Sequence, residues 1–514
     1  MTVALPAHRP DHDPINLKDT RVQPTRFDAI AKAWSGAASR RDALKLLVAA
    51  SLGGTLSTLA GSGADAARCR HGTTRCAGRC RNLKTDARHC GTCSTACGLG
   101  ETCVGGVCTC SGAGCGGGGA EAQRPFPQHV TYATGTIRPT SRSQNEQDAD
   151  VRAAYDRWKT RYLVKAGTSA GGDLYRVAFG KPGTNAHDVT VSEGMGFGMV
   201  IVPLMAGYDP DAQLLFDGLW RFARAHRSRI DGRLMGWKVP TAPGDRDSAF
   251  DGDCDMALGL LLAGAQWGSL GATDYRAATT TLLAGILGST IGPNSQLPML
   301  GDWVQASGAT FNEYTPRTSD FMLTNFRAFG RFTGDAVWNQ VVAACQDVID
   351  AIQANFSPDT GLLPDFITSK KDAGHTPEPA PPNFLEGPDD GHYSYNAGRD
   401  PWRLGTDALL TGDAASLRET RKISAWAQAK TGGDPQQIKA GYDLAGKPLS
   451  GSNYFTTFFA APLGVAAMTV SSQQTWLNAI YDAVRSRNED YYEDSVTLLC
   501  LLVMTGNFWD PTAA

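Results

Sequence analysis

The sequence predicts an all-α protein whose main domain is an (α/α)6 barrel, preceded by a small disulfide-rich N-terminal module. Two observations lead to this prediction. Twelve apolar segments with helical spacing follow residue 127, and loops rich in Gly, Pro and Asp separate them. Ten of the 13 cysteines lie between Cys69 and Cys115, ahead of those segments. Because the twelve segments show no repeated sequence period, a closed double ring of six helix pairs is favoured over a solenoid.

The twelve helices are expected one after another along residues 127–514, and no alternating pattern of apolar and polar residues predicts a β-sheet there. The predicted segments lie near residues 146–165, 192–206, 210–227, 252–267, 272–288, 318–332, 335–354, 400–411, 413–430, 452–469, 472–486 and 490–506.

Composition and charge exclude two classes of protein. The chain has 514 residues, a formal charge of −3, 42% hydrophobic and 19% charged residues, as an ordinary globular protein has. This balance offers no basic surface to nucleic acid, so we expect no nucleic-acid partner. Outside the N-terminal region no stretch approaches the ~20 apolar residues that a membrane span needs. We therefore expect no membrane span in the mature chain.

Residues 1–66 predict a disordered n-region followed by a twin-arginine export signal. Arg40 and Arg41 precede a weakly apolar run over residues 46–60, and Ala64-Asp65-Ala66 is typical of a signal-peptidase site. This pattern predicts a protein that is secreted or held at the cell surface, exported by the twin-arginine route. The alternative is a short amphipathic helix of a cytosolic protein.

Residues 67–116 form the predicted cysteine-rich module, and residues 117–126 a Gly-rich linker. The module is too short and too polar to bury a core unaided, so its closely spaced cysteines must be stapled by disulfides or by a metal. Disulfides are favoured outside the cell membrane. Zinc at Cys90-x-x-Cys93 is the alternative, but no histidine or second clean CxxC completes a ligand set. Cys254, Cys345 and Cys500, in the large domain, are expected to be buried and inert.

Two segments indicate a site. In the first, Ser192 is expected to cap a helix and to place Glu193 in its first turn, while glycines follow at positions 194, 196 and 198. Each glycine disfavours a helix by about 0.5–1 kcal/mol relative to alanine, and close approach of a ligand to the backbone would offset this. The alternative is a capped helix packed tightly against a neighbour.

In the second segment, Asp251, Asp253 and Asp255 alternate at the start of an apolar helix. A calcium loop is excluded, because Met256 stands where that loop needs glycine and Leu262 where it needs glutamate. One aspartate would suffice to complement the positive end of a helix. Three acids there indicate a functional purpose.

These segments resemble the signatures of glycoside hydrolase family 8 where that family keeps its catalytic acids. Four stretches match in the family's order and cover most of residues 127–514: Ser192-Glu193-Gly194 with Gly198-Met199, Ala249-Phe250-Asp251-Gly252-Asp253 with Met256-Ala257, Tyr395 to Arg403 with Asp407, and Leu498 to Trp509. The string from Cys80 to Cys93 is similar to Stig1-type cysteine-rich repeats, which specify no chemistry.

The resemblance implies an inverting, endo-acting hydrolase of a β-1,4-linked polysaccharide, with Glu193 as general acid and Asp251 binding the sugar before the cut. One branch of the family keeps its base aspartate where Asn396 stands, and an amide cannot accept a proton from water. In the chitosanase and lichenase branch, a glutamate of a preceding loop serves instead. Here that loop offers Glu386, favoured because it follows an apolar pair close to Tyr395, and Glu378.

The remaining expectations concern the substrate and partners. Trp237, Trp303, Tyr395 and Trp402 are candidate sugar-stacking platforms, some of which should line the cleft, while Asn396 and Arg399 are expected to contact substrate. β-Glucan, cellulose and chitosan stay open as substrates. We expect no metal, no cofactor and a monomer. The alternative function is a non-catalytic secreted carbohydrate-binding or surface-attachment protein derived from such an enzyme, a reading suggested by Asn396.

Overall fold

The computed structural model describes residues 69, 72–76, 79–86, 89–93, 102–109, 120–241 and 247–513. Those residues contain twelve α-helices, one for each predicted segment. Six form an inner set: α4 (Ser192–Leu204), α6 (Phe250–Trp267), α8 (Leu323–Thr333), α10 (Asp400–Thr411), α12 (Thr457–Ala467) and α14 (Tyr491–Met504). Six form an outer set: α3 (Gln144–Tyr162), α5 (Ala212–Ala225), α7 (Tyr275–Ser289), α9 (Val337–Asn355), α11 (Ala414–Thr431) and α13 (Gln474–Val484).

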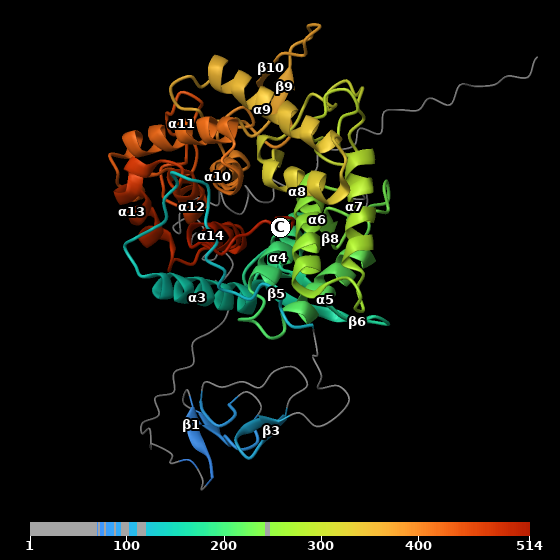
Figure 1. Ribbon diagram of the computed structural model, residues 1–514, viewed down its shortest axis with the longest axis vertical. Helices are drawn as coiled ribbons and strands as arrows, with labels where there is room; N and C mark the ends of the chain where they lie inside the picture. Colours follow the sequence, from blue (N-terminus) through green and yellow to red (C-terminus); the bar gives the residue numbers. More distant parts are fainter. Residues whose placement is uncertain are drawn as a thin grey trace, which may run out of the picture.

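The helices form a closed double ring (Figure 1). Each inner helix contacts the next along the chain, and α14 returns to contact α4. The outer helices α5, α7, α9, α11 and α13 pack on the inner helices that precede them, and α3 packs on α14. The predicted (α/α)6 barrel is therefore confirmed.

Burial separates the two rings. Every residue of α4 and of α12 is buried, as expected of a helix surrounded by other helices. The outer helix α5 buries one stripe that includes Leu215, Leu219 and Phe222, while its other face meets solvent. Cys254, Cys345 and Cys500, which have no disulfide partner among the described residues, are buried as predicted.

The loops differ in length between the two ends of the ring. Loops that lead from an inner helix to an outer one are short, such as residues 334–336 and 412–413. Loops that lead into inner helices include the long stretches 290–322 and 356–399. One end of the barrel, here called the catalytic face, therefore carries most of the irregular chain, and loops of this kind commonly carry function.

Short two-stranded β-sheets, which were not expected from the sequence, pair segments of these long loops. The paired strands are β5 (Leu163–Ser169) with β6 (Gly172–Val177), β7 (Thr190–Val191) with β8 (Lys238–Val239), and β9 (Ile367–Ser369) with β10 (Pro377–Pro379). All are antiparallel and two-stranded, too short to give the alternating pattern by which a sheet is recognised.

Disulfides staple the N-terminal module. Strands β1 (Thr74–Cys76) and β2 (Arg79–Arg81) form one hairpin, and β3 (Thr102–Val104) and β4 (Val107–Thr109) form another. The bonds join Cys69 to Cys80, Cys76 to Cys93, and Cys90 to Cys103. The disulfide prediction is confirmed for these six cysteines, although the bonds do not join the closest neighbours in sequence. Zinc at Cys90 and Cys93 is excluded, because both sulfurs are already bonded.

Two N-terminal predictions have different outcomes. The export signal in residues 1–66 lies outside the described residues. Part of the predicted linker is packed rather than free: the amides of Gln123 and Phe126 donate to Gln266 and Ala206, and Phe126 is buried. The glycines of the predicted linker at positions 117–119 lie outside the described residues, so a flexible linker there stays a prediction.

Candidate active site

The predicted acids meet on the catalytic face because they stand at the starts of inner helices. Glu193 lies in the first turn of α4 and Asp251 in the first turn of α6. Arg399 ends the short 3₁₀ helix Ala397–Arg399, which leads directly into α10. The ring brings these three helix starts together, although the residues are far apart in sequence.

The glycines of α4 serve helix packing, which corrects the expectation of a close ligand. A Cβ on Gly196 would lie 2.9 Å from the backbone oxygen of Gly252 in α6, and a Cβ on Gly194 would lie 2.6 Å from the Tyr491 hydroxyl oxygen. The cap prediction is also wrong, since Ser192 is the first helical residue and Val191 occupies the cap position. The tightly packed alternative is therefore the correct interpretation, and it fixes Glu193 against α6 and α14.

One arginine joins the two acids. Arg399 Nη1 donates to Glu193 Oε1 at 2.5 Å and to Asp251 Oδ2 at 2.8 Å. Its Nη2 donates to Ser319 Oγ at 2.7 Å and to Asn396 Oδ1 at 3.2 Å. Arg399 and Asp251 are fully buried and Glu193 is 2% exposed. A buried charge requires such pairing, so Arg399 holds both carboxylates in place. Its expected contact with substrate stays a prediction.

A second arginine, Arg317, lies before α8 and was not indicated by the sequence. Its Nη2 lies 3.4 Å from Asp251 Oδ2 and its Nε 3.2 Å from Asp320 Oδ1. Burial alone would raise the pKa of Asp251, but the charges of Arg317 and Arg399 hold it at about 2. Arg317 and Asp320 could have been noticed as charged residues just ahead of a predicted apolar helix, the position that Glu193 and Asp251 also occupy.

The neighbouring carboxyl, Asp320, behaves differently. Burial raises its pKa to about 6, and the Asp251 anion adds to this rise while Arg317 opposes it. Arg317 therefore lies beside two carboxyls that differ in charge. Asp251 is ionised across the ordinary pH range, and Asp320 titrates within it.

Glu386 lies beside Asn396, the position that the sequence analysis identified as lacking a carboxylate. Asn396 Nδ2 donates to Glu386 Oε2 at 3.0 Å. The backbone around Glu386 is fixed by the fully buried Asp390, whose carboxylate accepts from the amides of Leu385, Glu386 and Gly387 at 2.7, 2.9 and 2.9 Å. Glu378 belongs to strand β10 and lines a different hollow, so the structure brings only Glu386 next to Asn396.

A cavity of about 30 Å³ adjoins Glu386. Trp237, Ser248, Trp303 and Arg317 contribute to its lining. This volume is large enough for a water molecule, and polar partners are present in Glu386, Arg317 and Ser248. The arrangement can therefore hold a water against a carboxylate.

Of the three alternating aspartates, only Asp251 contacts Arg399 and Arg317. Asp253 Oδ1 accepts from the amide of Met235 at 2.9 Å, and Asp255 binds Arg403 Nη2 at 2.6 Å. Residues two apart point to different sides of a helix, which separates Asp253 from Asp251, whereas Asp255 lies one turn further along the same side as Asp251. Asp253 and Asp255 therefore have hydrogen-bond partners different from those of Asp251.

The candidate sugar platforms lie in different environments. Trp237 and Trp303 line the cavity beside Glu386. Tyr395 stacks on Phe458, with ring centroids 5.6 Å apart, and its hydroxyl bonds that of Tyr454 at 2.6 Å. Trp402 is 2% exposed, with the Arg403 guanidinium 4.0 Å from its ring centroid. Trp237 is buried to the same extent, so burial does not separate these candidates, and their role as sugar platforms stays a prediction.

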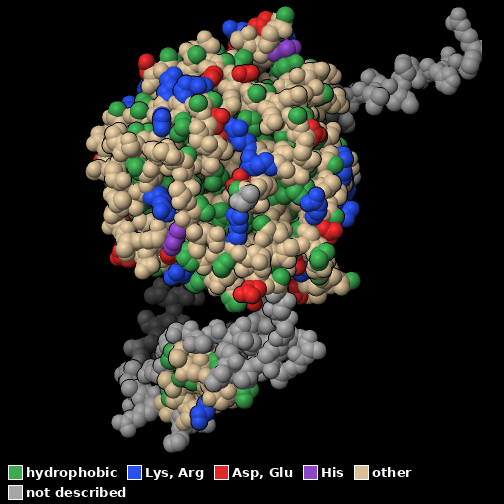
Figure 2. All heavy atoms as spheres, viewed as in Figure 1, with side chains coloured by type: hydrophobic (Ala, Val, Ile, Leu, Met, Phe, Trp, Pro, Cys, Tyr) green, Lys and Arg blue, Asp and Glu red, His purple; other side chains and the backbone are tan. Residues whose placement is uncertain are grey.

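The described part of the chain lacks two features, a metal-binding cluster and a membrane-spanning helix. It holds no group of three or more His, Cys, Asp or Glu residues able to bind a metal ion. Nor does any of its helices have the length and apolar character that crossing a bilayer requires. The space-filling view shows acidic and basic side chains interspersed over the face turned to the viewer (Figure 2).

Comparison with known proteins identifies both parts of the chain. Residues 125–506 match Glycosyl hydrolases family 8, and residues 57–111 match the Stigma-specific STIG1-like protein family. The chain is 42% identical over 394 residues to a beta-glucanase of Niallia circulans, covering 76% of this chain and 92% of that protein. It is 38% identical to an endoglucanase of Bacillus sp. (strain KSM-330), covering 76% of this chain and 83% of that one.

A solved structure agrees with these relatives. The apo structure of a beta-1,3-1,4-glucanase from Paenibacillus sp. X4 matches with a TM-score of 0.70 at 41% identity, covering 75% of this chain and 99% of that one. A xylobiose complex from Teredinibacter turnerae, at 18% identity and a TM-score of 0.58, shows the same fold. The chain belongs to glycosyl hydrolases family 8, as the resemblance implied, and it carries a STIG1-like N-terminal module.

Proposed function

We propose that this family 8 glycosyl hydrolase cuts mixed-linkage β-glucan internally and with inversion, using Glu193 as general acid and Glu386 as general base. The observation that carries the proposal is the hydrogen bond between Asn396 and Glu386. It places the Glu386 carboxylate beside Asn396, whose amide could not accept a proton from water. The rest of the site then has a consistent division of labour.

The two proposed partners lie in different environments. Glu193 is buried in the wall of the barrel, in contact with Arg399. Glu386 is only partly buried, and it adjoins a cavity able to hold water. An acid must deliver a proton to the leaving oxygen, whereas a base must activate water on the opposite side of the sugar. Asp251, ionised and fixed by two arginines, would bind the sugar before the cut and favour positive charge developing there.

The layout also supports inversion. Inverting enzymes keep their two carboxyls roughly 6.5–9.5 Å apart, so that a water fits between base and sugar. Here two side chains, Arg399 and Asn396, stand between Glu193 and Glu386 in an unbroken chain of hydrogen bonds. A direct carboxyl–carboxyl contact, which would leave no room for water, does not occur in that chain.

The substrate follows from the relatives. A beta-glucanase, an endoglucanase and a beta-1,3-1,4-glucanase are the similar proteins at 38–42% identity. Mixed-linkage β-glucan is thus favoured over chitosan, and internal cleavage over release of terminal sugars.

The deciding experiment measures new reducing ends from barley β-glucan, carboxymethylcellulose, chitosan and xylan, with the full chain. We expect β-glucan to be cut fastest, and Glu193→Gln and Glu386→Gln to lower kcat by about 10²–10⁴-fold. Glu378→Gln is the matched control and should retain its kcat. The anomeric configuration of the first product, followed by NMR, should be inverted. If Glu386→Gln kept its activity while Glu378→Gln lost it, the base would be misassigned.

The non-catalytic alternative has no observation in its favour. It was motivated by Asn396, and the carboxylate of Glu386 now stands beside that residue. A protein that only binds polysaccharide would need neither this carboxylate nor the buried Asp390 that holds its backbone.

Export is a further part of the proposal. The Arg40-Arg41 signal and a module closed by three disulfides both suit an oxidising compartment outside the cytosol. Replacing both arginines with lysine should retain the β-glucanase activity inside the cells instead of releasing it to the outside. Cleavage of the polymer outside unbroken cells by that variant would exclude the twin-arginine route. The monomeric state stays a prediction.

A further inference from the structure

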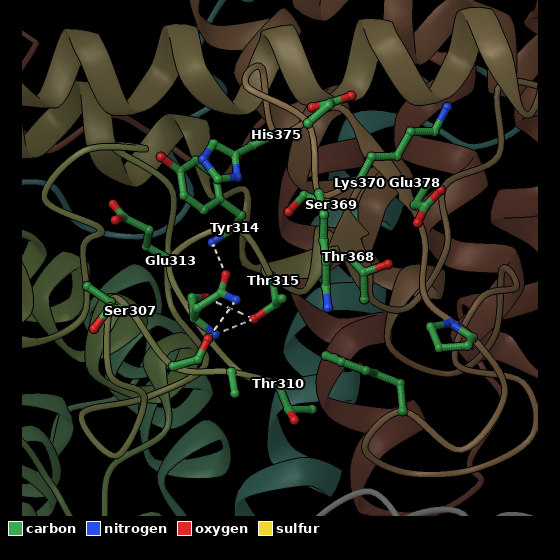
Figure 3. Close-up of a pocket in the computed structure, with 18 of the residues that line it drawn as sticks. Ser307, Thr310, Glu313, Tyr314, Thr315, Thr368, Ser369, Lys370, His375 and Glu378 are labelled. Carbon is green, nitrogen blue, oxygen red and sulfur yellow. Dashed lines mark hydrogen bonds between the residues drawn. The ribbon is translucent and has the colours of Figure 1, made fainter.

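A second hollow lies on the catalytic face beside the Glu386 loop, with a volume of about 1110 Å³. One wall is the loop of residues 306–315, which leads toward α8, and the other is the β9–β10 hairpin with the chain that follows it. Figure 3 shows Tyr314 and His375 together at the top of this groove, with Thr310, Thr315 and Thr368 below them. Nothing in the proposed acid–base chemistry uses these residues.

The groove begins close to the proposed site of cleavage. Phe384 lines the groove, and Glu386 follows it by two residues, so their Cα atoms are at most about 7 Å apart. An aromatic wall also joins the two places. Phe311 contacts Trp303, which lines the cavity beside Glu386, at 5.2 Å between ring centroids, and Phe384 at 5.0 Å. A chain leaving the cleft on this side therefore reaches the groove within a short distance.

The lining has the chemistry of a neutral sugar site. Hydroxyl and amide side chains predominate among the polar groups: Asn294, Ser307, Thr310, Asn312, Thr315, Thr368 and Ser369. The charged residues are of both signs, with Lys370 and Lys371 against Asp372 and Glu378. Glu313 is occupied, because its carboxylate accepts from the backbone amides of Asn294 and Ser295. Mixed charge and many hydroxyl partners suit an uncharged polymer better than a polycation or a polyanion.

The groove is also held open without a ligand. The rings of Tyr314 and His375 stack with centroids 3.7 Å apart and planes 8° from parallel, joining the two walls at one end. Below the stack, Asn312 Oδ1 accepts from the Tyr314 amide at 2.9 Å, and Asp372 accepts from the amide and hydroxyl of Thr376. A site formed in advance loses less conformational entropy when it binds.

We propose that this groove binds a segment of neutral β-glucan beyond the cleavage cleft, so that long chains are held at a second place while they are cut. This inference rests on the proposed function and adds a distal polysaccharide-binding site to it. Its specific consequence is a preference for polymer over short oligosaccharides, because only a long chain spans the cleft and the groove together.

The test compares barley β-glucan with a mixed-linkage tetrasaccharide as substrates of the full chain. Thr310→Trp fills the groove from an exposed position, and His375→Ala removes the stack that joins its walls. Thr280→Trp, at an exposed position of the outer helix α7, is the matched control. We expect both groove variants to lower kcat/KM on the polymer about tenfold and to leave kcat/KM on the tetrasaccharide unchanged.

Other results separate the two proposals. Equal losses on both substrates, or no loss in Thr310→Trp on either, would overturn the groove as a binding site while leaving the hydrolase intact. If the wild-type protein cut no β-glucan, the proposed function would fail. Retention of the chain in gels containing β-glucan would then test the groove separately. Weaker retention of Thr310→Trp than of Thr280→Trp would uphold it, and equal retention would overturn it.

Discussion

Two carboxyl groups of this barrel are equally hidden from solvent but differ in charge. Asp251, at the start of inner helix α6, and Glu419, in outer helix α11, are both fully buried. Burial would raise the pKa of Asp251, but Arg317 and Arg399 hold it at about 2, whereas burial raises the pKa of Glu419 to about 8. Both oxygens of Glu419 lack a hydrogen-bond partner, and the Arg418 guanidinium is 3.9 Å away. Burial thus decides nothing about charge until the partners are known.

The two residues also have opposite effects on stability as pH changes. The pKa of Asp251 is lowered in the folded state, so its stabilising contribution is present above the ordinary value of 3.8 and is lost as pH falls through about 2. The pKa of Glu419 is raised, so its favourable contribution is present below 4.5 and is lost as pH rises through about 8. Asp251 is kept charged by arginines, while the carboxyl of Glu419 in the outer wall is kept neutral.

The largest effect on this difference between Asp251 and Glu419 is expected from removing Arg399, the cation that Asp251 shares with Glu193. Arg399→Met leaves two buried carboxylates facing each other, so we expect kcat to fall at least about 10³-fold and the free energy of unfolding to fall by about 3–5 kcal/mol. Reducing-end assays and urea unfolding measure the two effects. Arg418→Met, the corresponding change near Glu419, is exposed and should alter neither by much. Similar losses in both variants would show that Arg399 has no special role.

A smaller effect, on the pH dependence of stability, is expected from replacing Glu419. Glu419→Gln cannot ionise, so its stability should not decline between pH 5 and pH 9 as the wild-type protein's does. We expect the difference between the two to change by roughly 2–4 kcal/mol over that interval, from the raised pKa of Glu419. Urea unfolding at several pH values measures it, and parallel curves for the two proteins would contradict a neutral Glu419. Activity near pH 6 should be unchanged, because Glu419 lies in the outer ring.

The finest test concerns the pH dependence of catalysis. In Asp251→Asn an anion beside Arg399 is lost, and a proton on Glu193 becomes easier to remove. We expect the alkaline limb of kcat against pH to move about one pH unit lower, besides any fall in kcat itself. Ser319→Ala removes a neutral partner of the same arginine and should leave the limb in place. An unmoved limb in Asp251→Asn would show that the acid and the aspartate are not coupled.

Much of the fold could be predicted from periodicity alone. All twelve helices correspond to apolar segments, since a buried ring of helices leaves a strong pattern with a period of 3.6 residues. The three small two-stranded sheets of the barrel left no such pattern, and residues 120–126 resemble a linker in composition although some of them pack on the barrel. The glycines of α4 were also misinterpreted. They allow close packing of Tyr491 and Gly252, whereas the sequence suggested that a ligand approaches the backbone there.

For the site, the residue types were recognisable but their partners were not. The signatures singled out Glu193 and Asp251, and the Asn396 substitution directed attention to Glu386. Nothing in the sequence showed which partners Asp253 and Asp255 would have, or distinguished the buried Trp402 from Trp303 beside the cavity. Arg317 and Asp320 belong to a loop with no recognised signature, and only the ring places them against α6.

The sequence by itself determined the helices, the cysteine-rich start and the residue types available for acid–base chemistry, because periodicity and side-chain chemistry are local properties. The tertiary structure decided which carboxyls are charged, which are neutral and which face one another. Those outcomes depend on electrostatic contacts between residues far apart in the chain, such as Arg399 with Glu193 and Asp251. Such contacts exist only once the ring has closed, and the low dielectric of the interior makes each of them decisive.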